Sequence, residues 1–112
     1  MEITIQSIHF NSKVELNDFI TEKVAKLAHL FDKIESASVT LKLEKSDTRE
    51  NKTCDIRLGV PGNDLFVSRQ SETFEAATID AVDALQEQIK RMKSKLMPIF
   101  FNVFNILPVG IY

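Results

Sequence analysis

The sequence contains few of the residues on which catalytic and metal sites depend. Among its 112 residues there are one cysteine, two histidines, three glycines and no tryptophan. The single cysteine, Cys54, excludes an internal disulfide, fits a reducing cytoplasm, and lies at an inward position of a predicted strand, as a core residue does. Three scattered glycines cannot form a glycine-rich phosphate loop, and His9 and His29 lack the spacing of a zinc site. The sequence therefore predicts a binding protein rather than an enzyme, with no metal, no cofactor and no small-molecule substrate.

A strong net charge and a targeting segment are also missing. The net charge is −2, from 14 basic and 16 acidic residues, which excludes a uniformly basic nucleic-acid-binding protein. It leaves room for a surface that is divided into acidic and basic regions. Residues 1–4 show neither the basic start nor the apolar run of a signal peptide, so we expect a cytoplasmic protein. With 44% hydrophobic residues, the chain can bury a core without disulfides.

Regular alternation of apolar and polar residues is what the sequence does contain. A period of two predicts four strands, over residues 3–8, 38–45, 53–60 and 65–70. Apolar residues three or four positions apart predict two helices, over residues 14–31 and 73–96. The order β-α-β-β-β-α predicts a two-layer α+β domain over residues 1–96, in which two helices cover one face of a four-stranded mixed sheet.

Capping and turn residues mark the ends of these elements. Asn11 or Ser12 is expected to cap the first helix, and Ser71 or Thr73 the second. Residues 61–64, Pro-Gly-Asn-Asp, suit a type II turn between the last two strands, because glycine tolerates the positive φ that this turn requires. These signals agree with the boundaries that the apolar pattern gives.

Charge is distributed unevenly along the second predicted helix. Residues 62–87 carry six acids and one base, whereas residues 88–96 carry four bases and no acid. The helix dipole favours acids at a helix start and bases at its end, which accounts for part of this division. Four bases in nine residues exceed that need. The basic end is therefore a candidate surface for phosphate groups.

Bases on the first predicted helix could extend this surface. At 100° per residue, Lys26, His29 and Lys33 fall on one side of a helix, away from its apolar stripe, and Lys23 lies at the border of that stripe. If the two helices lie side by side on the sheet, these bases join the basic end of the second helix and form a phosphate-binding site. The alternative interpretation is a solvated helix face without a ligand.

A series of short motifs resembles one known family. The motifs are FDKI at residues 31–34, VTLKLEK at 39–45, VPG at 60–62, FEAA at 74–77 and VDAL at 82–85, followed by a lysine-rich helix end. Their order and spacing over residues 1–96 are similar to the short form of the ribosome hibernation-promoting factor and ribosome-associated inhibitor family, which is also described as sigma-54 modulation protein-like.

The resemblance implies a ribosome-associated translation inhibitor. Such a protein binds small-subunit rRNA near the decoding centre and sterically blocks the tRNA and mRNA sites under stress or in stationary phase, without a catalytic step. The resemblance also implies a set of rRNA-binding bases on both helices and the sheet edge. Carried over by position, they are Lys23, Lys26, Lys33, Lys42, Lys45, Lys90, Arg91, Lys93 and Lys95.

The sequence departs from the family pattern in the second helix. Ala84, Gln86 and Glu87 stand where relatives usually carry bases, and Ile79 stands where relatives often have an acid. The expected RNA surface is therefore reduced in the middle of this helix. A double-stranded RNA-binding domain shares the β-β-β-α order, but it presents lysines at the helix start, where this chain is acidic.

Residues 97–112 form an uncharged, apolar tail that the resemblance does not cover. The tail is too short and too often interrupted by proline and asparagine to span a membrane. It could pack on its own domain, pair with a second chain to give a homodimer, or bind a partner. An alternative function follows from it, namely a self-associating protein-interaction module whose ribosome binding is weakened or lost.

Overall fold

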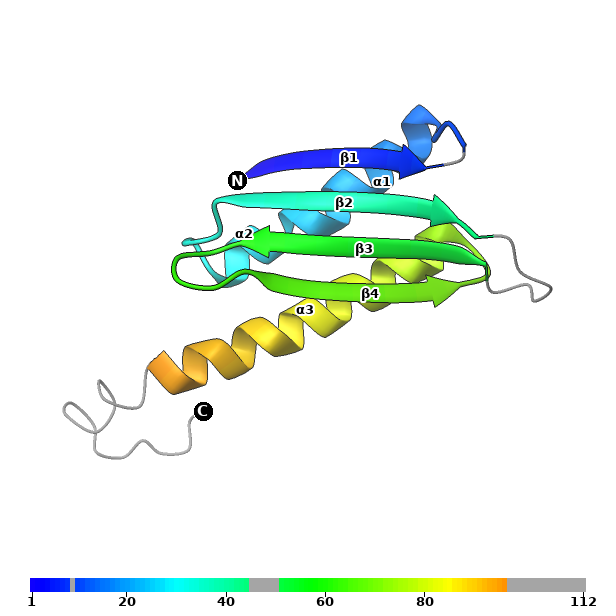
Figure 1. The fold of residues 1–112 in the computed structure, drawn as a ribbon. Helices are drawn as coiled ribbons and strands as arrows, with labels where there is room; N and C mark the ends of the chain where they lie inside the picture. The colour runs from blue at the N-terminus through cyan, green and yellow to red at the C-terminus, as the bar shows by residue number, and fades with distance from the viewer. Residues whose placement is uncertain (9, 45–50, 97–112) are drawn as a thin grey trace.

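The computed structural model describes residues 1–8, 10–44 and 51–96, the last three as backbone only, and the structural statements below refer to these residues (Figure 1). The predicted tail over residues 97–112 lies outside them. The elements follow in the order β1 (Glu2–Ile8), α1 (Val14–Ala25), α2 (Leu27–Leu30), β2 (Ser36–Leu43), β3 (Lys52–Gly59), β4 (Leu65–Ser71) and α3 (Phe74–Leu96).

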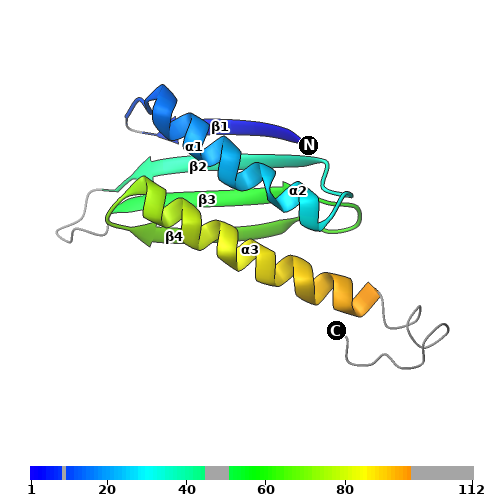
Figure 2. The same ribbon diagram turned by 180° about the vertical axis from the view of Figure 1, so that it is seen from behind.

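The sheet has the strand order β1-β2-β3-β4 and is mixed. β1 runs parallel to β2, with Ile5 opposite Val39, whereas β2–β3 and β3–β4 are antiparallel pairs. A parallel pair needs a crossover connection, which α1 and α2 supply here. The helices α1, α2 and α3 all cover the same face of the sheet, as Figures 1 and 2 show. The α+β architecture predicted from the sequence is confirmed.

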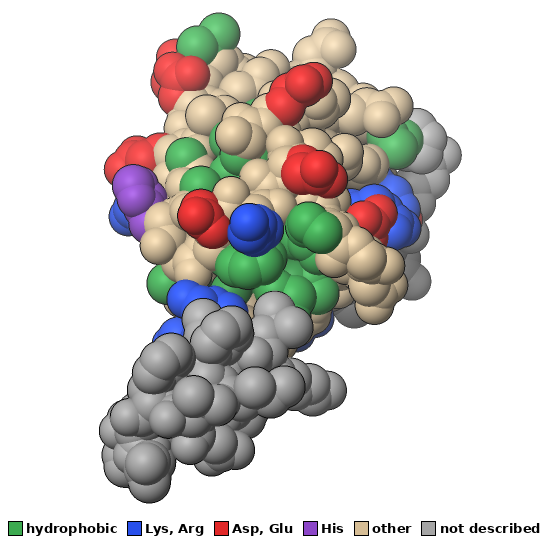
Figure 3. Space-filling model, turned by 90° about the vertical axis from the view of Figure 1, so that its left-hand side faces the viewer, with side chains coloured by type: hydrophobic (Ala, Val, Ile, Leu, Met, Phe, Trp, Pro, Cys, Tyr) green, Lys and Arg blue, Asp and Glu red, His purple; other side chains and the backbone are tan. Residues whose placement is uncertain are grey.

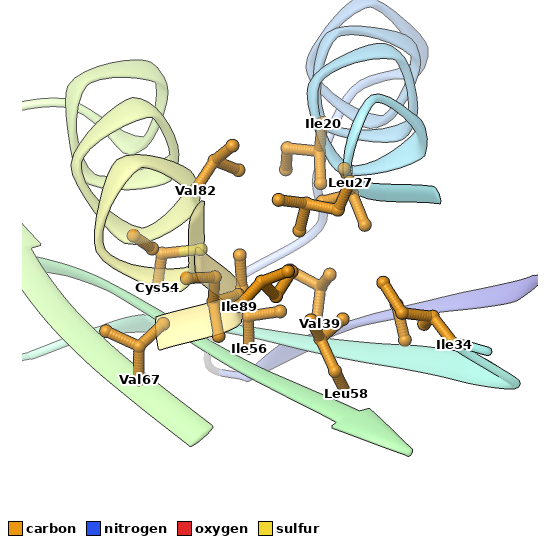
Figure 4. Close-up of a cluster of buried hydrophobic side chains, with 14 of the residues drawn as sticks. Ile20, Leu27, Ile34, Val39, Cys54, Ile56, Leu58, Val67, Val82 and Ile89 are labelled. Carbon is orange, nitrogen blue, oxygen red and sulfur yellow. The ribbon is translucent and has the colours of Figure 1, made fainter. Parts of the chain in front are cut away.

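The core lies between this face of the sheet and the helices (Figure 4). Alternate residues of β3 point into it, and Cys54, Ile56 and Leu58 are fully buried. Ile20 from α1 and Leu85 from α3 are equally buried and complete the layer above the sheet. Burying one such side chain stabilises the fold by about 1.5–3 kcal/mol, so the inward positions of the pattern carry most of the stability.

The thiol of Cys54 makes the fold less stable at alkaline pH. Burial, with a smaller contribution from the nearby charge of Asp55, raises the pKa of this thiol from 9.0 to about 11. The Thr78 hydroxyl, 3.6 Å from the sulfur, opposes the shift. The folded state therefore favours the neutral thiol. The stability that this preference gives to the fold is fully present below pH 9 and is lost as the pH rises through 11.

We expect the stability advantage of the native chain over a Cys54→Ala variant to shrink by roughly 2–3 kcal/mol between pH 8 and pH 11. The alanine variant serves as the reference because it retains every other group that titrates in this range. Urea unfolding of both proteins at several pH values measures the difference. Parallel stability curves over this range would contradict the assigned shift.

The helix predicted over residues 14–31 has the expected buried stripe but is not continuous. The His29 N–H donates to the Lys26 carbonyl at 3.1 Å, a bond across three residues rather than four, so the helix tightens between α1 and α2. Lys26 keeps right-handed helical angles, with φ −63° and ψ −24°. The tightening coincides with the three-residue step between the buried residues Val24 and Leu27.

The helical segment ends one residue before the predicted end at Phe31. The Phe31 backbone is extended, with φ −151° and ψ 109°, and α2 stops at Leu30. Lys33 therefore lies in a turn beyond the helix. The prediction that Lys33 shares a helical face with Lys26 and His29 is wrong, because the backbone has left the helix before it reaches Lys33.

The two helix starts differ in how they are capped. The Ala76 N–H donates to the Thr73 hydroxyl at 3.0 Å, which confirms one of the two caps predicted for α3. At α1 neither predicted residue is the cap, because Lys13 occupies that position without a side-chain bond. The Ser12 hydroxyl instead accepts from Ser7 and donates to Asn17, each at 2.8 Å.

The strand predictions are confirmed with small shifts in their bounds. β2 begins at Ser36, two residues earlier than predicted, because the parallel ladder with β1 starts there at Glu2. The turn before β4 contains Gly62 with φ +93°, the left-handed conformation that the type II turn requires.

Candidate nucleic-acid interface

Lys93 joins the end of α3 to the end of α2. Its Nζ donates to the backbone carbonyl of Leu30 at 2.7 Å. The last carbonyls of a helix lack partners within that helix, and a cation near them is electrostatically favourable. This contact places the basic end of α3 beside the α2 segment. The side-by-side arrangement on which the predicted phosphate site depends is therefore present.

Three exposed lysines lie in the segments that this contact joins, and we call Lys26, Lys33 and Lys90 the basic junction. Lys26 precedes α2 and Lys33 follows it in the turn. Lys90 lies about 60° around α3 from Lys93, on the same side of the helix. None of the three forms an ion pair with another described residue, so their charges are free to meet an anion. Figure 3 views the molecule from this end. Basic and acidic side chains are interspersed on this face, together with a histidine and an apolar patch.

Arg91 lies on a different side of α3. The Gln88 side chain donates to the Phe66 carbonyl of β4 at 3.3 Å, and the Asp80 carboxylate lies 4.0 Å from Arg69 of β4. Since Arg91 is three residues beyond Gln88, it lies on the β4 side and is exposed there. Lys95 belongs to the last turn of α3. The bases of α3 therefore point to at least two sides of the helix.

Two other candidates are engaged elsewhere. The Nζ of Lys23 lies 5.4 Å from the centroid of the Phe19 ring, and the lysine is half-buried against its own helix. Lys42 projects from the sheet face that carries no helix, and its Nζ lies 3.1 Å from the Asp55 carboxylate. Neither is part of the basic junction. Lys45 lies outside the described residues.

The open face of the sheet has an aromatic residue that the sequence analysis missed. Phe66 is 46% exposed, and the Arg57 guanidinium carbon lies 5.1 Å from the centroid of its ring. Arg57 also lies 3.9 Å from the Asp64 carboxylate. The signal was available, because Phe66 alternates with the inward-facing residues Leu65 and Val67 of β4.

The described part of the chain has neither a metal-binding cluster nor a helix that could cross a membrane. No three His, Cys, Asp or Glu side chains within it are grouped so that they could hold a metal ion. Among its helices, none combines the length and the apolar character that a membrane crossing requires.

Comparison with known proteins identifies the family. The model of the family "Sigma 54 modulation protein / S30EA ribosomal protein" matches residues 3–97. The chain belongs to this family. Curated relatives include the ribosome hibernation promoting factor of Pseudomonas putida, 30% identical over 85% of this chain and 89% of the relative. That of Escherichia coli K12 is 32% identical over 86% of this chain and 97% of the relative. The family is one of ribosome hibernation factors and not of enzymes.

Solved structures share the fold of this family member. The N-terminal domain of Thermus thermophilus Protein Y superposes with a TM-score of 0.70 at 26% identity, over 82% of this chain and 99% of that one. A ribosomal subunit interface protein from Coxiella burnetii gives a TM-score of 0.74 at 15% identity, over 84% and 99% of the two chains, which shows the fold alone. The family resemblance predicted from the sequence motifs is confirmed.

The middle of α3 gives this family member an acidic surface next to its basic junction. Asp83 and Glu87 are exposed, and neither forms an ion pair with another described residue. Ala84 and Gln86 beside them are partly buried. Ile79, one turn earlier, is 44% exposed. Free positive charge on α3 is therefore confined to its last two turns.

Proposed function

We propose that this chain is a ribosome hibernation factor that binds small-subunit rRNA near the decoding centre and sterically blocks the tRNA and mRNA sites. It would act in the cytoplasm, under stress or in stationary phase. The observation that carries the proposal is the basic junction, in which Lys93 holds α2 and α3 together between exposed lysines. Membership of the family supports the ribosome as the partner.

Phosphate binding is the chemistry that suits this surface. Exposed ammonium and guanidinium groups without acidic partners can neutralise backbone phosphates and release the counterions that these hold. Contacts with phosphates carry no sequence information, so the shape of the folded RNA would determine where the protein docks. Occupying a site that tRNA and mRNA need is sufficient for inhibition, and no reacting group is required.

The salt dependence of binding tests this proposal. Each phosphate contact adds about 0.7–0.9 to the slope of log affinity against log salt. If Lys26, Lys33, Lys90 and Arg91 each contact one phosphate, we expect a slope of about −3 to −4. Co-sedimentation of the purified protein with small ribosomal subunits at several salt concentrations measures it. A flat response, or no binding at low salt, would overturn the proposal.

A further inference from the structure

We infer that Lys93 is a positioning residue, which aligns the lysines next to α2 (Lys26 and Lys33) with Lys90 of α3 and is not itself a ligand of RNA phosphates. The inference rests on the proposed function and assigns Lys93 a different role from that of Lys90 and Arg91. Lys93 is partly buried, whereas Lys90 and Arg91 are exposed. Its Nζ is already bound to the Leu30 carbonyl at 2.7 Å.

The carbonyl that accepts this bond depends on Lys93 for a partner of this kind. α2 is one turn long, and its end is closed only by the Phe31 N–H, which donates to Leu27 at 3.3 Å. Leu30 is the last residue of α2, so no N–H group within the helix donates to its carbonyl. An ammonium group from a neighbouring helix supplies both the donor and the positive charge that a helix end favours.

The location of the bond explains why it would determine the relative position of the lysines in the basic junction. Leu30 lies three residues before Lys33, and Lys93 lies three residues after Lys90, so the bond links the two segments close to both exposed lysines. Figures 1 and 2 show that the last turns of α3 continue past the strands, where no sheet lies beneath them. The contact with α2 therefore fixes how this end of α3 sits relative to Lys33.

Three single variants separate positioning from direct phosphate binding. Lys90→Gln removes an exposed charge, and we expect about a fivefold loss of affinity at 0.1 M salt and a slope that is smaller by about 0.7–0.9. Lys93→Gln should lose affinity to a similar extent but keep the slope of the native chain. Lys93→Arg should restore the affinity, because its guanidinium can still donate to the Leu30 carbonyl.

Hydrogen exchange provides a measurement that does not require ribosomes. In Lys93→Gln we expect faster exchange of the Phe31 amide, which closes the end of α2, and of the His29 amide, which bonds to Lys26 at its start, than in the native chain or in Lys90→Gln. Unchanged exchange in Lys93→Gln, or a slope that falls as it does in Lys90→Gln, would overturn the positioning role. If the native chain does not bind ribosomes at all, the proposed function fails, and the exchange rates alone then support or reject the link between α2 and α3.

Discussion

A double variant, Lys33→Gln with Lys90→Gln, should bind small ribosomal subunits roughly 30-fold more weakly than the native chain at 0.1 M salt. The two lysines are exposed, lie on either side of the bond between α2 and α3, and have no acidic partner among the described residues. Losing two phosphate contacts should also reduce the salt slope by about 1.4–1.8. Quantitative co-sedimentation measures both quantities, and inhibition of translation in vitro should weaken in parallel.

A control with the same change in net charge distinguishes a local site from long-range attraction. Lys13 precedes α1 and Lys52 begins β3, both at the end of the molecule opposite the basic junction (Figure 1). The variant Lys13→Gln with Lys52→Gln should bind within about threefold of the native chain, because only general attraction is reduced. Equal losses in the two double variants would show that net charge matters and that the basic junction has no special role.

Leu85→Ala should destabilise the fold by about 2–5 kcal/mol. Leu85 is fully buried on α3 and packs in the layer that covers the central strands, so its removal leaves a cavity in the only core that the described residues form. The unfolding free energy of a domain this small is typically about 5–15 kcal/mol, so the variant would lose a large part of its stability. Urea unfolding followed by far-UV circular dichroism measures the change.

Asp83→Ala is the matched control for this substitution. Asp83 lies two residues away on the same helix but is exposed, so we expect its replacement to change stability by less than about 0.5 kcal/mol. Comparable losses for both variants would indicate that the loss does not arise from packing on the sheet, because alanine has the highest helical propensity and neither substitution weakens the helix itself. A loss below about 1 kcal/mol for Leu85→Ala would contradict the core position.

Much of the fold was predictable because its signals are local. The alternation in β3, with Cys54, Ile56 and Leu58 inward, follows from the geometry of a strand covered on one face. The break at Lys26 was not predictable from spacing, because a tightened turn and a regular helix bury the same apolar residues. The prediction placed the end of this helix one residue too late, at Phe31, since an aromatic side chain can reach the core from extended backbone as well as from a helix.

The residue types of the candidate site were predictable from the sequence, but the contacts that its side chains make within the protein were not. The sequence indicates which segments are rich in lysine, but each ion pair or hydrogen bond depends on how distant segments meet. Lys42 reaches Asp55, which lies diagonally across the strand pair, only because β2 and β3 are paired in one particular register. Lys93 reaches Leu30, 63 residues away in sequence, only once α2 and α3 have packed together.

The position of β1 in the sheet has a consequence for the order in which the chain can fold. Among the described residues its only neighbouring strand is β2, and Ile5 must wait for Val39, 34 residues later, before it can pair. By contrast, β3 and β4 pair across a short turn, with Ile56 opposite Val67. Closing the longer loop costs more chain entropy, so the β2–β3–β4 meander can form first and β1 joins it late. During synthesis β1 leaves the ribosome before its partner strand, so its backbone remains open to other contacts until β2 has emerged.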